Sequence, residues 1–218
     1  DGAVRLRQSG FAGEILLLEG YFGAAELVEI AGQGLATVVA GEEQLRLLEA
    51  HRPAASVDCY LKINTGMNRL GFPPAAARRA LERLTATGVA KSVTLMTHFA
   101  TADGPEGIAE AMRRFGEATN GMALPRSLSN SAAIFAHPEA HADTVRVGIA
   151  LYGATPFAHR SAEGIGLLPA MTLRSQLIAV QDLAPGETVG YGATYRTTKA
   201  MRLGIVACGY ADGYPRHA

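Results

Sequence analysis

Short apolar runs alternate with helical stretches along most of this 218-residue chain. The runs are rich in β-branched and aliphatic residues, and the stretches between them carry apolar residues at spacings of three and four, which is typical of amphipathic helices. The runs begin near residues 15, 36, 57, 92, 126 and 144. Strands that alternate with helices form a parallel sheet covered by those helices. We therefore predict an α/β domain with six parallel strands.

The regular strand-helix units predict a (β/α)8 TIM-type barrel, because polar residues cluster just past the strand ends, where such barrels build their sites. Six units cannot close a barrel. Since a whole barrel has about 250 residues, the two remaining units would add roughly 60 residues. We place these units before Asp1, and we expect both ends to be truncated, because the chain starts without methionine and stops at Ala218. An open doubly wound sheet is the alternative.

The pattern changes after Phe157. Three strand-like runs follow, separated by turns rich in glycine and proline and without a helical stretch between them. They cover residues 173–180, 187–189 and 201–207. We predict a barrel domain over residues 1–160 that lacks its first units, and the start of an all-β C-terminal domain over residues 165–218.

The composition favours an enzyme that acts on a small molecule. Twenty acidic and twenty basic side chains give a net charge of zero, so neither nucleic acid nor a membrane surface is expected as a partner. Cys59 and Cys208 lie in apolar runs without metal-type spacing, so we expect no metal site and two buried free thiols in a reducing compartment. The sequence shows no signal peptide and no apolar run of membrane-spanning length, which predicts a cytoplasmic protein.

The stretch from Val57 to Phe72 combines a buried strand with two basic residues. Lys62 lies inside the apolar run, where an unpaired ammonium group is costly, so we expect it to be paired, chemically altered or close to a sheet edge. Arg69 follows a glycine turn. There its guanidinium group can bind a carboxylate in two places, or remain a solvated loop cation.

Polar residues also follow the later strands. His98 ends the fourth strand, where a single histidine is more often structural than catalytic. Asn130 and Ser131 begin the helix after the fifth strand, and small polar side chains there can cap the helix or help its N–H groups to hold a phosphate. Arg146 lies in the sixth strand, followed by Gly148, where the backbone can approach a ligand closely. Phosphate sites in such barrels tend to lie in the last two strand-helix loops, which is where these residues fall.

Six motifs in order resemble the alanine racemase family, the pyridoxal-phosphate enzymes that interconvert L- and D-alanine. They are Leu-Lys-Ile-Asn-Thr-Gly-Met-Asn-Arg-Leu-Gly-Phe (61–72), Met-Thr-His-Phe-Ala (96–100), Ser-Asn-Ser-Ala (129–132), Val-Arg-Val-Gly-Ile-Ala-Leu-Tyr-Gly (145–153), Gly-Tyr-Gly-Ala-Thr-Tyr (190–195) and Gly-Tyr-Ala-Asp-Gly-Tyr (209–214). The resemblance covers nearly the whole chain. It implies a barrel followed by a β domain, pyridoxal 5'-phosphate as cofactor, and two-base racemisation of alanine that supplies D-alanine for peptidoglycan. It also implies a homodimer whose sites are shared between subunits.

The resemblance also implies roles for individual residues. Arg146 would hydrogen-bond the pyridine nitrogen of the cofactor, and Arg69 would lie near the phenolic oxygen and the substrate carboxylate. Tyr191 would be the base on one face of the substrate, coupled to His98 and through it to Arg146. Lys62 would match the lysine that is carbamylated in many members. The other cofactor contacts, mostly to the phosphate, would come from Asn130, Ser131, Gly148, Ile149 and Tyr210.

One part of the family pattern is missing. The family's second acid/base is a lysine that binds the cofactor covalently, in a Lys-Ala-Asn-Ala-Tyr-Gly-like stretch. The lysines here are Lys62, Lys91 and Lys199, and none stands in that context. We therefore expect the 218-residue chain to be inactive by itself. The alternatives are a related racemase of another amino acid, a decarboxylase of basic amino acids, which the Gly-Tyr-Gly motif disfavours, and a non-catalytic fragment that binds ligands.

Overall fold

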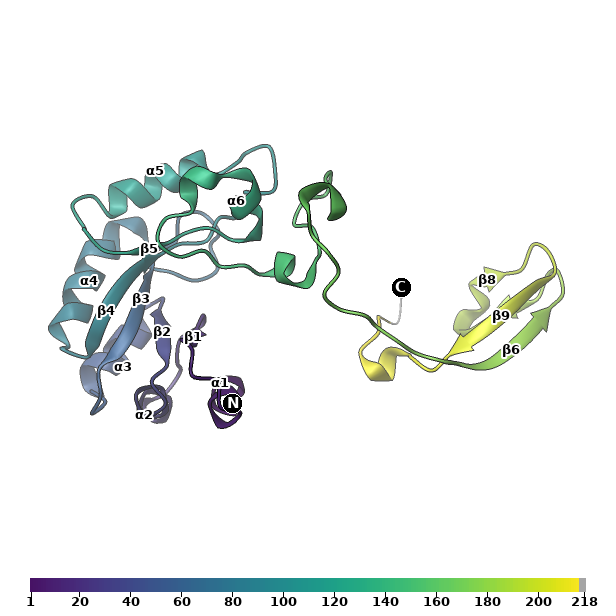
Figure 1. Ribbon diagram of the computed structural model, residues 1–218, viewed down its shortest axis with the longest axis horizontal. Coiled ribbons are helices and arrows are strands. Elements are labelled where there is room, and N and C mark those ends of the chain that lie inside the picture. The colour runs from purple at the N-terminus through teal and green to yellow at the C-terminus, as the bar shows by residue number, and fades with distance from the viewer. Residues whose placement is uncertain (216–218) are drawn as a thin grey trace. The chain divides into compact units, whose positions relative to one another are not determined.

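The computed structural model describes residues 1–215 and divides into two compact units (Figure 1). Unit 1 extends from Asp1 to Ala170, and unit 2 begins at Met171. We describe each unit separately. The predicted bounds, a barrel domain over residues 1–160 and the start of a β domain over residues 165–218, stay a prediction.

Unit 1 contains a five-stranded parallel sheet with the strand order β1-β2-β3-β4-β5. The strands are β1 (Leu16–Leu17), β2 (Ala36–Val39), β3 (Val57–Lys62), β4 (Ala90–Met96) and β5 (Arg126–Ser127). A doubly wound sheet reverses its strand order at a switch point. The order here instead runs in one direction, as it does in a barrel. The barrel-type prediction is therefore confirmed over the doubly wound alternative.

A helix follows each strand, and one further helix precedes β1. They are α1 (Gly2–Gln8), α2 (Ala24–Gly32), α3 (Glu42–Ala50), α4 (Ala77–Ala86), α5 (Ala109–Ala118) and α6 (Ser131–Ala136). The alternation predicted α2 to α6, and a 3-10 turn over Pro74–Ala76 opens α4 at the expected prolines. Helix α5 starts at Ala109 rather than near Pro105, because Gly107 takes a left-handed φ of +60° just before it. Among residues 1–215, no helix is both long and apolar enough to cross a lipid bilayer.

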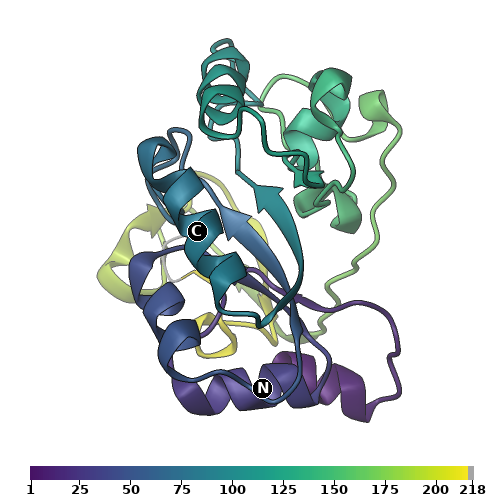
Figure 2. The ribbon, with the colours of Figure 1, turned by 90° about the vertical axis from the view of Figure 1, so that its left-hand side faces the viewer.

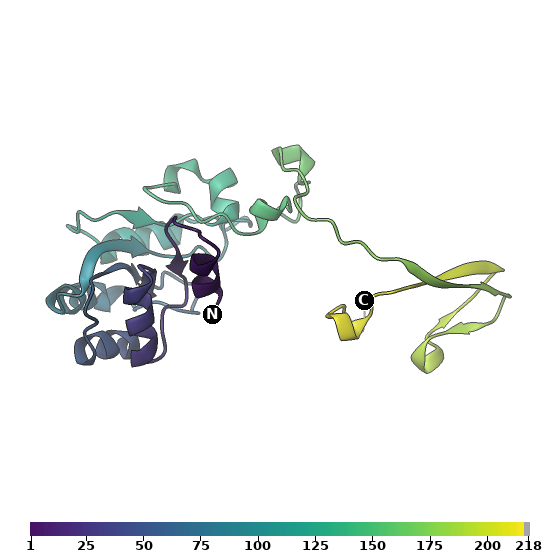
Figure 3. The same ribbon diagram turned by 60° about the horizontal axis from the view of Figure 1, so that its bottom comes forward.

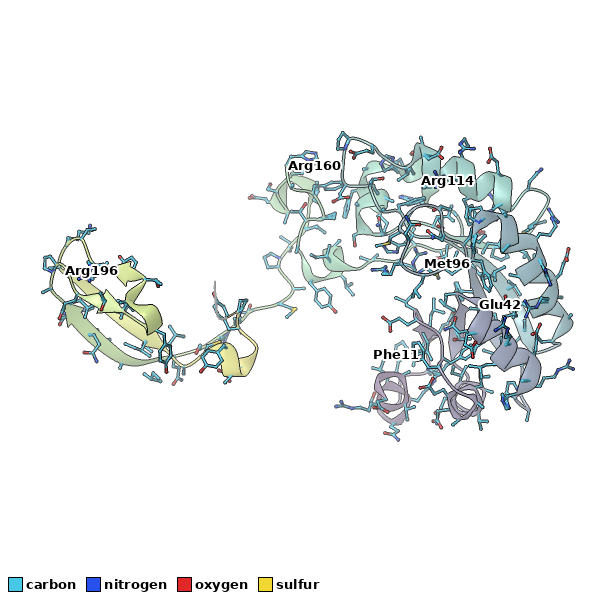
Figure 4. The ribbon with its side chains drawn as sticks, turned by 180° about the vertical axis from the view of Figure 1, so that it is seen from behind. Phe11, Glu42, Met96, Arg114, Arg160 and Arg196 are labelled. Carbon is cyan, nitrogen blue, oxygen red and sulfur yellow. The ribbon has the colours of Figure 1, made fainter. Side chains whose placement is uncertain are left out.

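The two faces of the sheet differ in their neighbours. Side chains alternate along a strand, so Leu61 and Tyr60 point to opposite faces. Leu61 belongs to the main core, which joins strand residues to helix residues such as Leu27 and Leu84. Tyr60 belongs to a small cluster formed by residues in or next to strands, including Met96, which Figure 4 labels. The helices therefore cover one face, with α3 and α4 in front of the strands in Figure 2, and the other face is the inner face of the barrel.

The prediction of a sixth strand over residues 144–149 is wrong. Only Thr144 forms a parallel bridge, to Ser127 of β5, although the Arg146 N–H also donates to the Ser129 carbonyl at 2.9 Å. A 3-10 helix begins at Ile149. Because β5 itself spans only two residues, the neighbouring segment finds too few partner groups to continue a ladder.

Unit 2 is built from antiparallel strands (Figures 1 and 3). Strand β6 (Leu177–Leu183) pairs with β9 (Met201–Val206), and β7 (Thr188–Val189) pairs with β8 (Tyr195–Arg196). Two predicted runs correspond to β7 and β9, whereas the run expected from residue 173 begins only at Leu177. Strand β8 lies where the sequence predicted a loop. The all-β character of this segment is confirmed.

The two cysteines differ in exposure, so the expectation that both are buried is wrong for one of them. Cys59 is fully buried in β3, and Cys208 is partly exposed. Burial raises the pKa of the Cys59 thiol to about 12, with a smaller contribution from the carboxylate of Asp58.

Because the thiolate is the reactive form, we expect iodoacetamide at about pH 8 to modify Cys208 and to leave Cys59 intact. Peptide mass spectrometry with and without denaturant measures both sites in one sample. Equal modification of Cys59 in folded and unfolded protein would contradict the prediction.

Candidate active site

A cavity of about 1090 Å³ lies at the carboxyl ends of the strands of unit 1. Parallel strands end at the same edge of a sheet, so residues far apart in the sequence meet there. The sequence-predicted residues that line the cavity are Lys62, Arg69, His98, Asn130, Ser131, Arg146, Gly148 and Ile149. The structure therefore brings together every predicted site residue of unit 1.

Arg146 ties the ends of β4 and β5 together. Its Nη1 donates to Ser127 Oγ at 2.7 Å, and its Nη2 donates to the carbonyl oxygens of Thr97 at 2.5 Å and Leu128 at 3.2 Å. A guanidinium group carries five N–H bonds, so the Nε–H and one Nη1 hydrogen are left for a ligand. Burial lowers the pKa of Arg146 to about 10, which still leaves the side chain cationic near neutral pH.

His98 lies just past β4, between two nitrogen donors. Its Nδ1 is 3.4 Å from Arg146 Nη2, and its Nε2 is 3.4 Å from Asn130 Nδ2. Burial lowers the pKa of His98 to about 4, and the positive charges of Arg146, Lys62 and Arg69 act in the same direction. The imidazole ring is therefore neutral near neutral pH.

Asn130 is the N-cap of α6. Its Oδ1 accepts a hydrogen bond from the Ala133 N–H at 3.1 Å, which is the capping role that the sequence left open. Its Nδ2 donates to the Phe99 carbonyl at 3.0 Å. The side chain thus connects the start of α6 to the segment that follows β4.

Ser131 is buried at the first turn of α6 and faces the segment that follows Arg146. Its Oγ accepts hydrogen bonds from the N–H groups of Gly148 at 2.9 Å and Ala150 at 3.4 Å. A Cβ atom at Gly148 would lie 3.6 Å from this oxygen, so the glycine keeps the space beside the hydroxyl group open. A hydroxyl group beside several backbone N–H groups is a suitable environment for an anion.

Lys62 ends β3 with 7% of its surface exposed. Burial lowers its pKa, the positive charges of Arg69 and Arg146 lower it further, and only the Glu19 carboxylate acts in the opposite direction. This environment increases the share of the neutral amine, which is the nucleophilic form of lysine.

The loop over residues 64–72 places Arg69 at the rim of the cavity. Asn64 Oδ1 accepts hydrogen bonds from the N–H groups of Gly66 at 3.1 Å and Asn68 at 3.0 Å, so the loop turns around one amide side chain. The Arg69 side chain is exposed and lines the cavity. The guanidinium group is therefore accessible to an anionic ligand.

Sequence reasoning missed two residues that line the cavity. Glu19 directly follows the apolar run that contains β1, and its position past a strand end is a signal that could have found it. Gln44 is buried in the first turn of α3, and its Nε2 donates to the carbonyl oxygens of Glu19 at 2.8 Å and Tyr21 at 3.2 Å. No signal could have found Gln44, because a polar residue in the first turn of an amphipathic helix is usually solvated.

Tyr191 and Tyr210 lie in unit 2, and 86% and 64% of their surfaces are exposed. Neither is part of a strand: they begin the 3-10 turns Tyr191–Ala193 and Tyr210–Asp212. Gly190 and Gly192 flank Tyr191 with left-handed φ values of 72° and 76°. Both rings are accessible to a ligand or to a second protein surface, and their catalytic and binding roles stay predictions.

Comparison with known proteins gives a consistent result across both units. The chain matches the family model "Alanine racemase, N-terminal domain" over residues 1–156 and "Alanine racemase, C-terminal domain" over residues 170–218. Alanine racemases from Nitrosospira multiformis and Ralstonia nicotianae are 55% and 56% identical to it. The matches cover 100% of this chain in both cases, and 62% and 58% of the relatives' own lengths.

Solved structures extend this similarity to three dimensions. The crystal structure of biosynthetic alanine racemase from Pseudomonas aeruginosa has a TM-score of 0.90 and 42% identity, and the match covers 98% of this chain and 60% of that one. A histidine racemase from Leuconostoc mesenteroides has a TM-score of 0.80 and 25% identity, over 99% of this chain and 60% of that one. The chain spans less than two thirds of the length of these relatives. With both family models matched in order, the chain belongs to the alanine racemase family.

Proposed function

We propose that this protein is a cytoplasmic enzyme that interconverts L- and D-alanine with pyridoxal 5'-phosphate and supplies D-alanine for peptidoglycan. Its membership of the alanine racemase family supports the reaction. The observation that carries the proposal is the convergence of Arg146, Ser131, Lys62 and Arg69 on one cavity at the carboxyl ends of the strands.

The donors in the cavity fit the cofactor that enzymes of this family generally use. Arg146 keeps two N–H groups for an acceptor such as the pyridine nitrogen, and its positive charge resists protonation of that nitrogen. The Ser131 hydroxyl group, which accepts the Gly148 N–H, keeps its own O–H to donate to the phosphate group, and Gly148 leaves space beside it. When bound there, the cofactor supplies an electron sink that acidifies the α-hydrogen of the amino acid.

Lys62 is the proposed carbamylation site. Its neutral amine, which burial and neighbouring cations favour, would add to carbon dioxide and lose a proton to give an anionic carbamate. This change replaces a buried cation near Arg69 by an anion that can pair with it. Arg69 would then be held at the rim, with its remaining N–H groups directed at the substrate carboxylate.

Tyr191 is proposed as the acid/base on one face of the substrate, with neutral His98 and cationic Arg146 behind it. The second acid/base of the family, a lysine, has no counterpart among these 218 residues. We propose that Tyr191 acts in the site of the partner subunit of a homodimer, because it belongs to unit 2 whereas the cavity residues belong to unit 1.

Tyr191→Phe tests the proposal in the full-length enzyme that includes the cofactor lysine, and we expect it to lower the racemisation rate by roughly 10²- to 10⁴-fold, the usual contribution of a general acid/base. Because Tyr191 serves one face only, α-hydrogen exchange in deuterium oxide should fall much more for one alanine enantiomer than for the other. Tyr195→Phe is the matched control, since Tyr195 is a half-exposed tyrosine of the same unit. Equal losses in the two variants, or equal losses of both exchange rates, would contradict the role of Tyr191.

A racemase of another amino acid is the second candidate, because the fold is shared with a histidine racemase. Measuring kcat/KM for a panel of L-amino acids distinguishes the two candidate functions. We expect alanine to have the highest kcat/KM. A higher value for a larger amino acid would favour the second candidate and leave the assignment of the cavity in place.

A further inference from the structure

We propose that Asn130 is a positioning residue that keeps the imidazole of His98 neutral by presenting an amide N–H group to its Nε2 atom. The consequence for catalysis rests on the proposed function, whereas the interaction itself does not. Both ring nitrogens of His98 face side-chain nitrogens at 3.4 Å, and both of these side chains are hydrogen-bond donors.

The orientation of the Asn130 amide is fixed by two other contacts. Its Oδ1 accepts from the Ala133 N–H and its Nδ2 donates to the Phe99 carbonyl. A flipped amide would place two oxygens against each other and two donors against each other. The group that faces His98 Nε2 is therefore NH₂, which can only donate.

Arg146 and Asn130 differ in the number of hydrogens that they have available for the ring. Both hydrogens of Arg146 Nη2 already have acceptors, the carbonyl oxygens of Thr97 and Leu128. Asn130 Nδ2 uses one hydrogen for Phe99 and retains the other for His98 Nε2. This assigns the lone pair to Nε2 and the ring hydrogen to Nδ1.

A second proton on His98 is opposed from both sides. On Nε2 it would meet the Asn130 amide hydrogen, and the charges around the ring, from Arg146, Lys62 and Arg69, are all positive. The cations act at a distance, whereas Asn130 acts on one atom. A neutral His98 whose single lone pair already accepts from Asn130 does not take the proton of a phenol, which leaves Tyr191 free to exchange that proton with substrate.

The test compares three N-cap residues at position 130. Asn130→Ser keeps a good N-cap and removes the amide donor, and Asn130→Asp keeps a good N-cap and replaces the donor by a carboxylate acceptor. The readout is the ¹⁵N NMR titration of His98 in the protein without cofactor, which reports the tautomer and the protonation state. Thermal unfolding and the amide NMR spectrum establish that each variant is folded.

We expect a neutral, Nδ1-protonated ring in the unsubstituted protein. In Asn130→Asp the titration midpoint should move upward by about one to three pH units, because a nearby carboxylate favours the cation. In Asn130→Ser the hydrogen should move toward Nε2, with a smaller upward shift. If Asn130→Asp does not fold, the tautomer in Asn130→Ser decides the question.

An Nε2-protonated ring in the unsubstituted protein, or a titration and tautomer that neither variant changes, would overturn the proposal. Burial and the three cations would then be sufficient to keep the ring neutral without Asn130. The outcome is independent of the proposed function, because no substrate is turned over. If the variants shift the titration midpoint of His98 but the protein has no racemase activity, the role of Asn130 is supported and the proposed function is contradicted.

Discussion

Mixing the Tyr191→Phe and Arg69→Ala variants of the full-length enzyme, which includes the cofactor lysine, under conditions of subunit exchange should restore racemase activity that neither variant has alone. The expectation follows from the proposed homodimer, in which each site combines the cavity of one subunit with Tyr191 of the other. The heterodimer then has one site without substitutions and one site with both. The isolated heterodimer should have about half of the wild-type activity, and an equal mixture about a quarter.

Both substitutions suit this experiment, because the Arg69 and Tyr191 side chains are exposed and neither belongs to a core. The matched control mixes Arg69→Ala with His98→Gln. Both of these residues lie in unit 1, so every site of that heterodimer carries one substitution and no activity should return. Recovery in the control, or no recovery in the test pair despite verified exchange, would contradict sharing of the site between subunits.

The strand ends of unit 1 could be predicted because each combines two strong local signals. Lys62 is a cation inside an apolar run and His98 follows an apolar run, and the barrel rule then places these residues at one edge. Helix α1 carries no such signal, since none of its residues is buried. It is attached by Ala3, which is partly buried against the main core, and by Arg7, whose side chain donates to the carbonyl oxygens of Gln33 and Gly34. A contact between a side chain and a distant backbone leaves no periodic pattern in the sequence.

The same limit applies inside the site. The sequence placed Asn130 and His98 near the cavity, but the number of hydrogens that each neighbour has available depends on carbonyl groups such as that of Phe99. A sequence motif does not show which backbone carbonyl groups lie near these side chains. Residue types and strand ends predict which side chains meet, whereas tautomer and charge depend on three-dimensional contacts.

The loop that carries Arg69 should be very sensitive to substitution at Gly71 and much less sensitive at Gly66. Both glycines have positive φ values, +124° and +140°, which an alanine adopts only with strain. At Gly71 an added Cβ would also lie 2.7 Å from the backbone nitrogen of Asn64 and 2.9 Å from the carbonyl carbon of Ile63. At Gly66 it would meet no atom within 4 Å.

Gly66→Ala should therefore cost about 1–3 kcal/mol, the usual price of backbone strain, and Gly71→Ala should cost at least about 4 kcal/mol, which is exceptional for one substitution. Chemical denaturation measures both differences in the free energy of unfolding. Similar losses in the free energy of unfolding would show that the positive φ values, and not the contacts of the added Cβ atom, determine the effect of both substitutions. The Gly71 N–H also donates to the Ala40 carbonyl at 3.1 Å, so a displaced Gly71 would detach the loop from the end of β2. Because these are backbone contacts, Arg69→Ala should leave the loop intact, and its effect on activity then reports the guanidinium group alone.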